Sequence, residues 1–328
     1  MSKKKYIILT GANGYLGSYI CRELVGQGYG VIAFRFKHWA STIIEHEDIG
    51  YYNVDISKKI EPQQDFDTIL KDKNIAGIIN AAALLGSSDF EKNHLVNAFG
   101  VTNMVEFAKE RNISRFIQIS SVVVLKNIKG PYGITKLEGQ KILERSGLDH
   151  TTFIPAMILG PESLGINRIL KNVYRFPLVV PLIGFGKQTQ HPIYVRDFAK
   201  YIVKSIESPV CHGKTYQIAG DSIIPFRNLI RMILRIKGDK KLFVPIPPAV
   251  ARGMGKFFQA IQKVPVFTAE HVKGIMQDSR LDTLPLEQDL EFSPTPLEEA
   301  LRQTLDEIGS DWNKYLQPRK ERVVKIDE

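Results

Sequence analysis

The sequence predicts a doubly wound α/β fold, a Rossmann-type parallel sheet with a smaller, mainly helical C-terminal lobe. Short apolar runs alternate with helical patterns through the first half of the chain. These runs are apolar along their whole length, which is typical of parallel strands covered on both faces. After His150 prolines accumulate and the pattern becomes mainly helical. With 328 residues, of which 44% are hydrophobic, the chain can bury a large core.

Six strands and four helices are expected in order through the first half. The strands are predicted at residues 6–9, 31–34, 51–54, 75–79, 116–119 and 151–154. The helices between them are predicted at residues 15–24, 66–71, 90–111 and 132–145. This alternation of strand and helix places helices on both faces of one parallel sheet.

The second half extends the sheet and adds the lobe. We expect another sheet-covering helix at 195–206 and another strand at 214–219. Further helices are predicted at 226–236, 248–262, 268–275 and 297–308. The predicted division is a Rossmann domain of residues 1–160 that also takes 191–220, a substrate lobe of 161–190 and 221–317, and a loose charged tail of 318–328.

The chain is basic, with a formal net charge of +9 and a pI near 9.3. A basic surface suits nucleic acid, a membrane surface or an anionic small ligand. The basic clusters are short and carry no interleaved aromatic residues, which argues against nucleic acid and favours a phosphate-rich ligand. No apolar stretch reaches the roughly 18 residues that a membrane span needs.

Cysteine usage and the N-terminus indicate the compartment. The two cysteines, Cys21 and Cys211, lack metal-ligand spacing and suggest a reducing environment. Three lysines near the N-terminus are followed by a predicted strand rather than by a cleavable apolar segment. We therefore expect a cytoplasmic protein. Because His, Cys and carboxylate residues show no clustered spacing, no metal site is predicted.

A glycine-rich loop joins the first predicted strand to the first helix. Its sequence at residues 10–17 is Thr-Gly-Ala-Asn-Gly-Tyr-Leu-Gly. Such glycines let the backbone approach a pyrophosphate, and the helix N-terminus offers free N–H groups with partial positive charge. The strand–turn–helix context favours a dinucleotide site over a tight turn without a ligand. The predicted contacts are Gly11, Asn13, Gly14, Tyr15, Leu16 and Gly17.

The end of the second strand indicates which dinucleotide binds. An acidic residue there holds the ribose hydroxyls of NAD, whereas an arginine accommodates the 2′-phosphate of NADP. The chain has Arg35 there, followed by Lys37 and His38, so NADP(H) is favoured and NAD(H) is the alternative. A solvated basic loop is the other interpretation of Arg35. Asp55 and Ile56, after the third strand, are also assigned to the cofactor site, where Asp55 either accepts from the adenine amino group or caps a helix.

A serine pair, a tyrosine and a lysine are predicted to meet at one edge of the sheet. Ser120 and Ser121 follow the fifth strand, and Tyr132 and Lys136 stand four residues apart at the start of a helix. Residues with that spacing share a helix face. Ligands of open parallel sheets bind beyond the carboxyl ends of the strands, where these residues converge.

Hydride transfer explains why these residue types belong together. Reduction of a carbonyl needs a proton donor for the developing alkoxide, and the reverse reaction needs a base. An ordinary tyrosine pKa is about 10, and we expect the Lys136 ammonium and an oxidised nicotinamide ring to lower the pKa of Tyr132. The serine hydroxyl would hold the substrate oxygen. An ordinary amphipathic helix end with a surface lysine is the alternative interpretation of the Tyr-Lys pair taken alone.

In these motifs the chain resembles the extended short-chain dehydrogenase/reductase family, which contains nucleotide-sugar epimerases, dehydratases and ketoreductases. The resemblance covers most of the chain, and its marks are the glycine loop, residues 80–83, 97–103, 116–121, 131–136, Pro155, 160–161, 194–197 and 289–297. It implies that Ser121, Tyr132 and Lys136 are catalytic and that Asn97 supports the site. The cofactor contacts it adds are Ala81, Ala82, Ala83, Tyr132, Lys136 and Pro155.

The favoured function is an NADP(H)-dependent oxidoreductase that interconverts a keto and a hydroxyl group on a sugar-like, nucleotide-activated or related substrate. A nucleotide-sugar epimerase or dehydratase with bound NAD is the alternative. Against it stand Arg35, Leu125 where many sugar-active members have tyrosine, Ile154 where many have arginine, and the short gap from Ser121 to Tyr132. A catalytically silent cofactor-sensing or scaffold protein is the alternative of another class. By resemblance we also expect a homodimer.

Two further features have open interpretations. The apolar, proline-broken stretch at residues 176–183 is predicted to line the substrate cleft or to pack as core, and contact with a lipid-linked substrate or a membrane surface is the alternative. Helix 248–262, with Phe257, Phe258 and Ile261 on one side, is expected to pack on the lobe. His191 either touches substrate or is an ordinary loop histidine.

Overall fold

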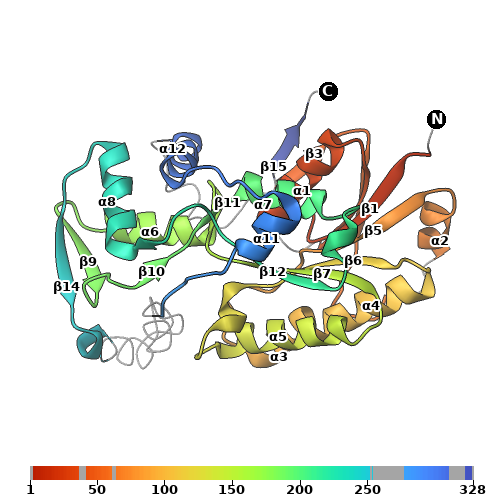
Figure 1. Ribbon diagram of the computed structural model, residues 1–328, viewed down its shortest axis with the longest axis horizontal. Helices are drawn as coiled ribbons and strands as arrows, with labels where there is room; N and C mark the ends of the chain where they lie inside the picture. The colour runs from red at the N-terminus through yellow and green to blue at the C-terminus, as the bar shows by residue number, and fades with distance from the viewer. Residues whose placement is uncertain are drawn as a thin grey trace.

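The computed structural model describes residues 3–36, 42–60, 64–251, 253, 277–309 and 322–326. A large sheet with its helices occupies one end of the molecule, and a smaller lobe occupies the other (Figure 1). Most of the predicted helix at 248–262, with its aromatic face, and the whole of the predicted helix at 268–275 lie outside the described residues, as does His38.

Seven parallel strands form the large sheet, which confirms the predicted fold class. Its order is β12-β7-β6-β5-β1-β2-β4. The strands are β1 (Lys5–Thr10), β2 (Gly30–Arg35), β4 (Ile49–Asn53), β5 (Asn74–Asn80), β6 (Arg115–Ile119), β7 (Asp149–Pro155) and β12 (Lys214–Ile218). After β1 the chain adds β2 and β4 on one side of β1. It then adds β5 on the other side of β1. The strand order therefore reverses at β1 and β5, where doubly wound sheets bind ligands.

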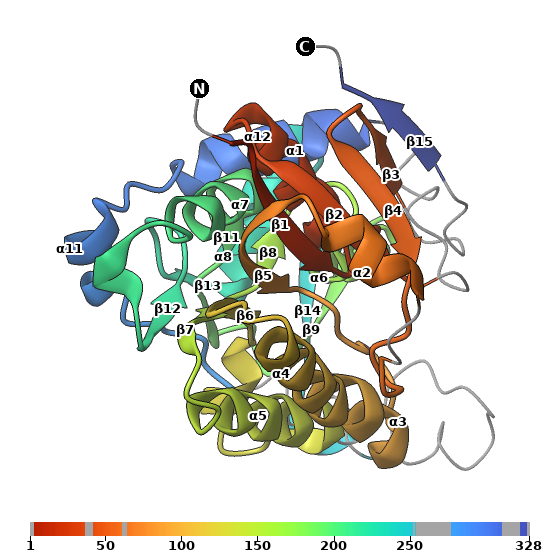
Figure 2. The same cartoon turned by 90° about the vertical axis from the view of Figure 1, so that its right-hand side faces the viewer.

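Helices cover both faces of this sheet (Figure 2). On one face lie α1 (Tyr15–Gly26) and α7 (Val195–Lys204), and on the other α4 (Gly100–Glu110) and α5 (Gly130–Glu144). Successive residues of β1 supply both cores, since Ile7 packs with the α1 and α7 side and Ile8 with the α4 side. This two-sided burial explains why the strands are apolar along their whole length.

The predicted helix at 90–111 is interrupted. It consists of α3 (Phe90–His94), a π-helical turn η1 (Leu95–Phe99) and α4. Asn97, inside the π-helical turn, accepts a hydrogen bond from Leu84 N at 2.9 Å and donates from Nδ2 to Leu84 O at 3.3 Å. Because such turns add a residue to the helical repeat, apolar periodicity alone could not show this one.

Two short strands differ from the sequence-based expectation. β3 (Thr42–Glu45) was not predicted, and it pairs in parallel with β15 (Arg322–Lys325), whose residues were expected to be loose tail. Ile44 of β3 is completely buried and packs in the core on the α1 side of the sheet. The prediction failed because each strand has only four residues and includes charged residues, so neither gives a clear apolar strand pattern in the sequence.

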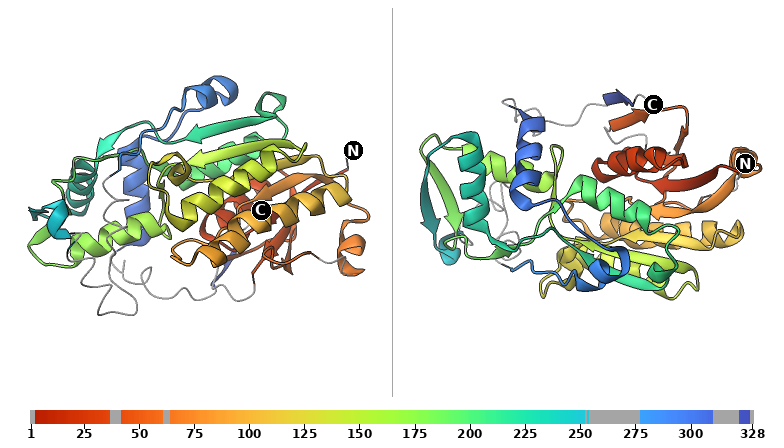
Figure 3. Two further views of the ribbon diagram at one scale, coloured as in Figure 1. Left: turned by 90° about the horizontal axis from the view of Figure 1, so that it is seen from below. Right: turned by 45° about the horizontal axis from the view of Figure 1, so that its top comes forward.

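The lobe has its own apolar core. Its main helices are α6 (Leu164–Tyr174), α8 (Phe226–Lys237) and α12 (Leu297–Ile308), and its strands β9 (Val179–Ile183) and β14 (Leu242–Ile246) pair in parallel. Figure 3 shows the lobe beside the sheet domain, and Tyr15, Leu16 and Tyr19 of α1 pack against the lobe's core. The remaining elements are α2 (Gln64–Leu70), α11 (Leu284–Leu290), β8 (Ile158–Leu159), β10 (Thr189–Gln190), β11 (Ile193–Tyr194), β13 (Ile224–Pro225), η2 (Val122–Leu125) and η3 (Pro209–Cys211).

No helix within the described ranges is long and apolar enough to cross a membrane. The predicted boundaries between the Rossmann domain, the lobe and the tail remain predictions, although separate apolar cores on the two sides of α1 are consistent with them.

Candidate functional site

The glycine loop lies between β1 and α1, at the point where the strand order reverses. Gly11 has a φ of +64°, a conformation that favours glycine, and a Cβ there would lie 2.9 Å from backbone atoms of Ala82. A Cβ on Gly17 would collide with the Gly11 carbonyl oxygen. Two of the three glycines are therefore required for the loop to pack on itself and on the loop after β5.

Gly14 has a different environment. Among the described residues, a Cβ built there would have only Gly11 within 4 Å, with its carbonyl oxygen at 3.0 Å and its carbonyl carbon at 4.0 Å. Gly14 is also the N-cap of α1, and no side chain caps the free N–H groups of the first turn. An uncapped helix N-terminus beside a glycine with open space is suited to an anion such as a pyrophosphate. The loop thus fits a dinucleotide on the structure's own geometry.

The other loop residues predicted to contact cofactor have structural partners as well. Asn13 is buried, and its carbonyl accepts a hydrogen bond from Thr42 N at 3.2 Å. The Tyr15 hydroxyl donates to Leu159 O at 3.0 Å, so this side chain connects α1 to the lobe. Leu16 packs between the core on the α1 side and the core of the lobe.

A buried hydrogen-bond chain holds the loop after β5 beside the glycine loop. Thr10 Oγ1 donates to Asn80 Oδ1 at 2.5 Å and accepts from Ala82 N at 3.1 Å. Asn80 Nδ2 in turn donates to Gln118 Oε1 at 2.9 Å. Three adjacent strands are thereby tied at their carboxyl ends, which positions Ala81, Ala82 and Ala83. Sequence reasoning missed Thr10 and Gln118, because only the sheet order brings them together.

Arg35 ends β2, as predicted. Its Nε donates to Asn53 Oδ1 at 3.0 Å, across the β2–β4 pair in which the two residues are register partners. The side chain is half-buried at the carboxyl edge of the sheet. Arg35 is therefore held beside the glycine loop's end of the sheet, and its role toward a cofactor remains a prediction.

Asp55 caps a turn rather than a helix, so the predicted helix cap is not found there, and its predicted contact with adenine stays a prediction. Its Oδ1 accepts from Ser57 N at 3.0 Å and from Ser57 Oγ at 2.6 Å. Ile56 is buried under Gly100, and its carbonyl accepts from Asn103 Nδ2 at 2.7 Å. These contacts join the segment after β4 to the start of α4.

Ser121, Tyr132 and Lys136 come together at the carboxyl end of β6. The Ser121 side chain is a hydrogen-bond partner of Tyr132. Lys136, only 2% exposed, donates from Nζ to Ile119 O at 2.5 Å, two residues before Ser121. Ser120 is buried and its Oγ faces Gln140 Oε1 at 3.4 Å. Of the two serines, Ser121 is thus the one that contacts the tyrosine.

Burial shifts the pKa values of the tyrosine and the lysine in opposite directions. It raises the pKa of Tyr132 to about 12, and the hydrogen bond from Ser121 only partly opposes this. It lowers the pKa of Lys136 to about 8. The sequence-based expectation was that Lys136 would lower the pKa of Tyr132, but desolvation dominates and Ser121 is the group that opposes it. A tyrosine in this state keeps its proton at neutral pH.

Residues 277–281 cross the loop that follows Ser121. Lys126 Nζ hydrogen-bonds Asp278 O and, at 2.8 Å, Ser279 Oγ. Leu281 packs with Ala156, next to the predicted cofactor contact Pro155 at the end of β7. The lobe therefore covers the Ser121 loop through a segment about 150 residues distant in sequence, which no local pattern could reveal.

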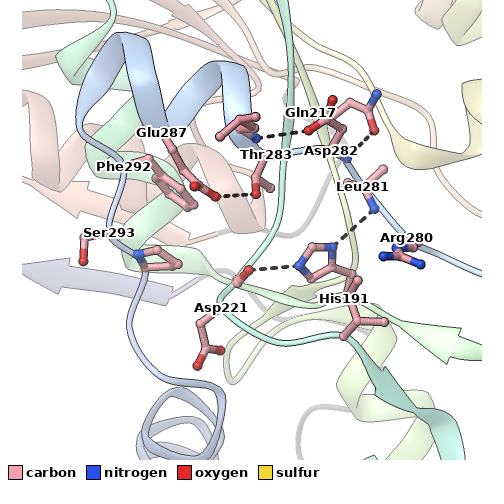
Figure 4. A pocket seen from close by; sticks show the side chains of 14 residues that line it. His191, Gln217, Asp221, Arg280, Leu281, Asp282, Thr283, Glu287, Phe292 and Ser293 are labelled. Atoms are coloured by element: carbon pink, nitrogen blue, oxygen red, sulfur yellow. Dashed lines mark hydrogen bonds between the residues drawn. The ribbon is translucent and has the colours of Figure 1, made fainter.

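A separate pocket of about 1000 Å³ lies beside the end of β12, and no predicted cofactor or catalytic residue lines it (Figure 4). His191, on its wall, contacts Gly220 O through Nε2 at 3.0 Å and accepts from Leu281 N at 3.3 Å. Burial lowers the pKa of His191, which keeps the ring neutral. His191 thus ties two backbone segments together. The described residues contain no group of three His, Cys, Asp or Glu side chains able to hold a metal.

The sequence pattern of the NAD dependent epimerase/dehydratase family matches residues 7–219. That range includes the glycine loop, the β5 loop, Ser121, Tyr132 and Lys136. The chain belongs to this family and is an NAD(P)-dependent enzyme of the extended short-chain dehydrogenase/reductase type, as the motifs indicated.

Individual relatives are distant. A 2-alkyl-3-oxoalkanoate reductase from Stenotrophomonas maltophilia is 22% identical over 72% of this chain and 77% of its own length. The structure of an epimerase from Methanothermobacter thermautotrophicus superposes with a TM-score of 0.75 at 17% identity, over 96% of this chain and 95% of the other. A UDP-glucuronic acid 4-epimerase from Bacillus cereus, in complex with UDP-glucuronic acid and NAD, has a TM-score of 0.69 at 20% identity over 92% and 98% of the two chains. At these identities the superpositions establish the fold.

Proposed function

We propose that this protein is an NADP(H)-dependent oxidoreductase that interconverts a keto and a hydroxyl group on a sugar-like substrate. The observation that carries the proposal is the grouping of Ser121, Tyr132 and the buried Lys136 at the carboxyl end of β6, next to β5 and the switch point of the sheet. A protonated tyrosine, a hydroxyl and an ammonium beside a dinucleotide cradle are the groups that carbonyl reduction requires.

Tyr132 acts as the general acid in the reducing direction. With a pKa raised to about 12 it holds its proton at neutral pH, ready to protonate the alkoxide oxygen. Ser121 orients the substrate oxygen toward the tyrosine hydroxyl. The Lys136 ammonium, with a pKa near 8, stabilises the tyrosinate that remains after the proton leaves. The bound nicotinamide supplies the hydride in this direction and accepts it in the other.

The N-terminus of α1 and the open side of Gly14 would hold the pyrophosphate, and the backbone of the loop after β5 would contribute to the same site. Arg35 distinguishes NADP(H) from NAD(H), because a guanidinium at the end of β2 suits a 2′-phosphate and no carboxylate occupies that position. NAD(H) is the alternative cofactor.

The substrate is proposed to be sugar-like, since the sugar-nucleotide ligand named for the Bacillus cereus structure accompanies the same fold. It would enter between the Ser121 loop and the lobe, in a site covered by residues 277–281. The proposed assembly is a homodimer through α3, η1 and α5.

The decisive experiment is a titration of the purified protein with NADPH and with NADH, followed by fluorescence or calorimetry. Preference for NADPH, with no cofactor co-purifying, supports a reductase that exchanges its cofactor at each turnover. Tightly held NAD that co-purifies would instead support the epimerase alternative, in which hydride leaves and returns without net redox change. Binding of neither cofactor would support the scaffold alternative.

A further inference from the structure

The chain's positive charge is concentrated in one part of the fold. Residues 164–187 and 226–250 contain ten of the 44 Lys and Arg residues and one of the 35 acidic residues, Asp239. The rest of the chain therefore carries 34 basic and 34 acidic residues and is neutral overall. The whole formal net charge of +9 resides in two segments that lie together in the lobe, because β9 of the first pairs with β14 of the second.

Most of these cations are not neutralised. Among the described residues, only Arg235 of the ten forms a salt bridge, with Glu298. Asp239 accepts a hydrogen bond from the Tyr174 hydroxyl at 2.5 Å. Cations flank both strands along the chain, with Arg175 before β9, Lys187 after it and Lys240 before β14.

Large apolar side chains are exposed on β14 and on the residues that flank β9. β9 reads Val-Val-Pro-Leu-Ile and β14 reads Leu-Phe-Val-Pro-Ile, so neither strand contains a polar residue. Val180, Leu182 and Phe243 face the lobe's core. The residues between them point to the opposite face of the strands. A strand whose opposite face is exposed to solvent ordinarily has polar residues on that face.

Leu178 and Leu242 have the highest exposed fractions, 75% and 73%, of the large apolar residues in the described ranges. The hydrogen bond from Leu242 N to Leu178 O at 2.9 Å makes them neighbours. Phe185, at the turn that follows β9, is 61% exposed. The apolar tip, as we name this surface, comprises Phe176, Leu178, Phe185, Leu242 and Val244. It lies at the end of the molecule farthest from β1 and β2 (Figure 1).

We propose that the apolar tip and its surrounding cations dock the protein on the surface of an anionic lipid bilayer. Exposed leucine and phenylalanine side chains would enter the boundary between headgroups and acyl chains, and the cations would bind acidic headgroups. A projecting apolar end with a basic surround fits a lipid surface better than it fits a nucleic acid, which would require stacking platforms and polar base contacts. The docking surface is distinct from the Ser121, Tyr132 and Lys136 site.

Vesicle co-sedimentation of the full chain tests the proposal. The probes are phosphatidylcholine vesicles with about 30 mol% phosphatidylglycerol, and phosphatidylcholine vesicles alone. We expect binding to the first, little binding to the second, and loss of binding as salt screens the charges. Lys187→Gln and Lys240→Gln should each weaken binding by about fivefold, because one basic residue near an anionic surface contributes ~1 kcal/mol. The double variant Leu178→Ser/Leu242→Ser should also weaken it.

Matched controls carry the same changes elsewhere. Leu284→Ser removes an exposed leucine from α11, and Lys92→Gln removes an exposed lysine from α3, and both should bind like the wild type. The proposal is overturned if the wild type does not bind anionic vesicles. That result would be expected if the apolar tip bound an acidic protein instead. The proposal is equally overturned if the tip variants bind no worse than the two controls. Neither readout depends on the enzyme's activity.

Discussion

Tyr132 and Lys136 illustrate at the scale of single residues how burial prepares a site for chemistry. Both side chains belong to α5 and stand one helical turn apart, and removal from water displaces their pKa values in opposite directions. The tyrosine becomes a weaker acid that keeps its proton at neutral pH until it is transferred, and the lysine becomes an ammonium that loses its proton more readily. Each shift disfavours the charged form, which identifies desolvation as the common cause.

Tyr132→Phe should abolish turnover while leaving dinucleotide affinity nearly unchanged. Loss of a general acid lowers rates by about 10²–10⁴-fold, and the phenyl ring preserves the packing on α5. Steady-state kinetics and a cofactor titration of the same preparation measure the two effects. Tyr29→Phe is the matched control, since its hydroxyl hydrogen-bonds Glu207 on the surface at 2.7 Å. Full turnover by Tyr132→Phe would remove the tyrosine from the mechanism.

Lys136→Met should inactivate the enzyme and yet stabilise the fold at pH 7. The folded-state pKa of Lys136 is about 8, below its ordinary value of 10.5, so the buried ammonium opposes folding at every pH below about 8. As the pH rises from 8 toward 10.5 the folded protein binds fewer protons than the unfolded chain, and this destabilising contribution disappears. Replacement by methionine should gain on the order of 1–3 kcal/mol at pH 7.

Thermal unfolding of both proteins at pH 7 and at pH 10 measures this difference. The advantage of Lys136→Met should shrink at the higher pH. Ile119 O keeps a donor in the variant, because Gln118 Nε2 also reaches it at 3.2 Å. A variant that is less stable than the wild type at pH 7 would show that the lysine is a structural anchor.

Arg35→Asp should shift the preference from NADPH toward NADH. The carboxylate would repel a 2′-phosphate and accept hydrogen bonds from ribose hydroxyls, and Arg35 lies at the strand end where this distinction is made. The ratio of the two dissociation constants measures the shift. Arg302→Asp on α12, exposed and remote, controls for the change in net charge. An unaltered ratio would exclude Arg35 as the residue that recognises the phosphate.

At the scale of elements, the three glycines of the first loop serve different purposes. Gly17→Val should destabilise the whole protein, because its side chain would collide with the Gly11 carbonyl. Gly14→Val should fold and fail to bind dinucleotide, because its side chain would enter the space beside the α1 N-terminus that we propose for the pyrophosphate. Melting temperature and cofactor titration separate the two results. Normal cofactor binding by Gly14→Val would contradict the assignment of the loop.

Elements whose signal is local in sequence were predictable, and those that depend on distant partners were not. The glycine loop and the Tyr132–Lys136 spacing are visible within a few residues, and the seven strands of the sheet were all predicted. The Thr10–Asn80–Gln118 chain joins side chains from three strands that become neighbours only in the folded sheet. The β3–β15 pair also joins segments that are distant in sequence, whereas the π-helical turn at Asn97 was missed because it alters the helical repeat locally.

At the scale of the whole molecule, two layers of helices leave one apolar surface uncovered. Leu95 and Phe99, four residues apart on η1, and Ile134 on α5 are all large exposed apolar residues. The helices that carry them pack together on one face of the sheet (Figure 2). Leu95 and Phe99 share one side of η1 because of their spacing, and Ile134 is exposed on the adjoining α5, so these neighbouring elements offer apolar side chains to a second copy of the chain.

Leu95→Glu/Phe99→Glu should therefore convert a homodimer into a monomer. In a twofold interface the introduced glutamates of one subunit would face those of the other. These carboxylates would be buried without a positively charged partner, which strongly destabilises the dimer. Light scattering coupled to size-exclusion chromatography measures the mass, and Leu284→Glu on α11 places the same charge on an exposed leucine outside this surface. A wild type that elutes as a monomer, or a double variant that remains dimeric, would exclude this interface.

Because α5 also carries Tyr132 and Lys136, we expect the monomeric variant to lose part of its turnover as well. The loss would come from a less rigid helix rather than from any contact with substrate.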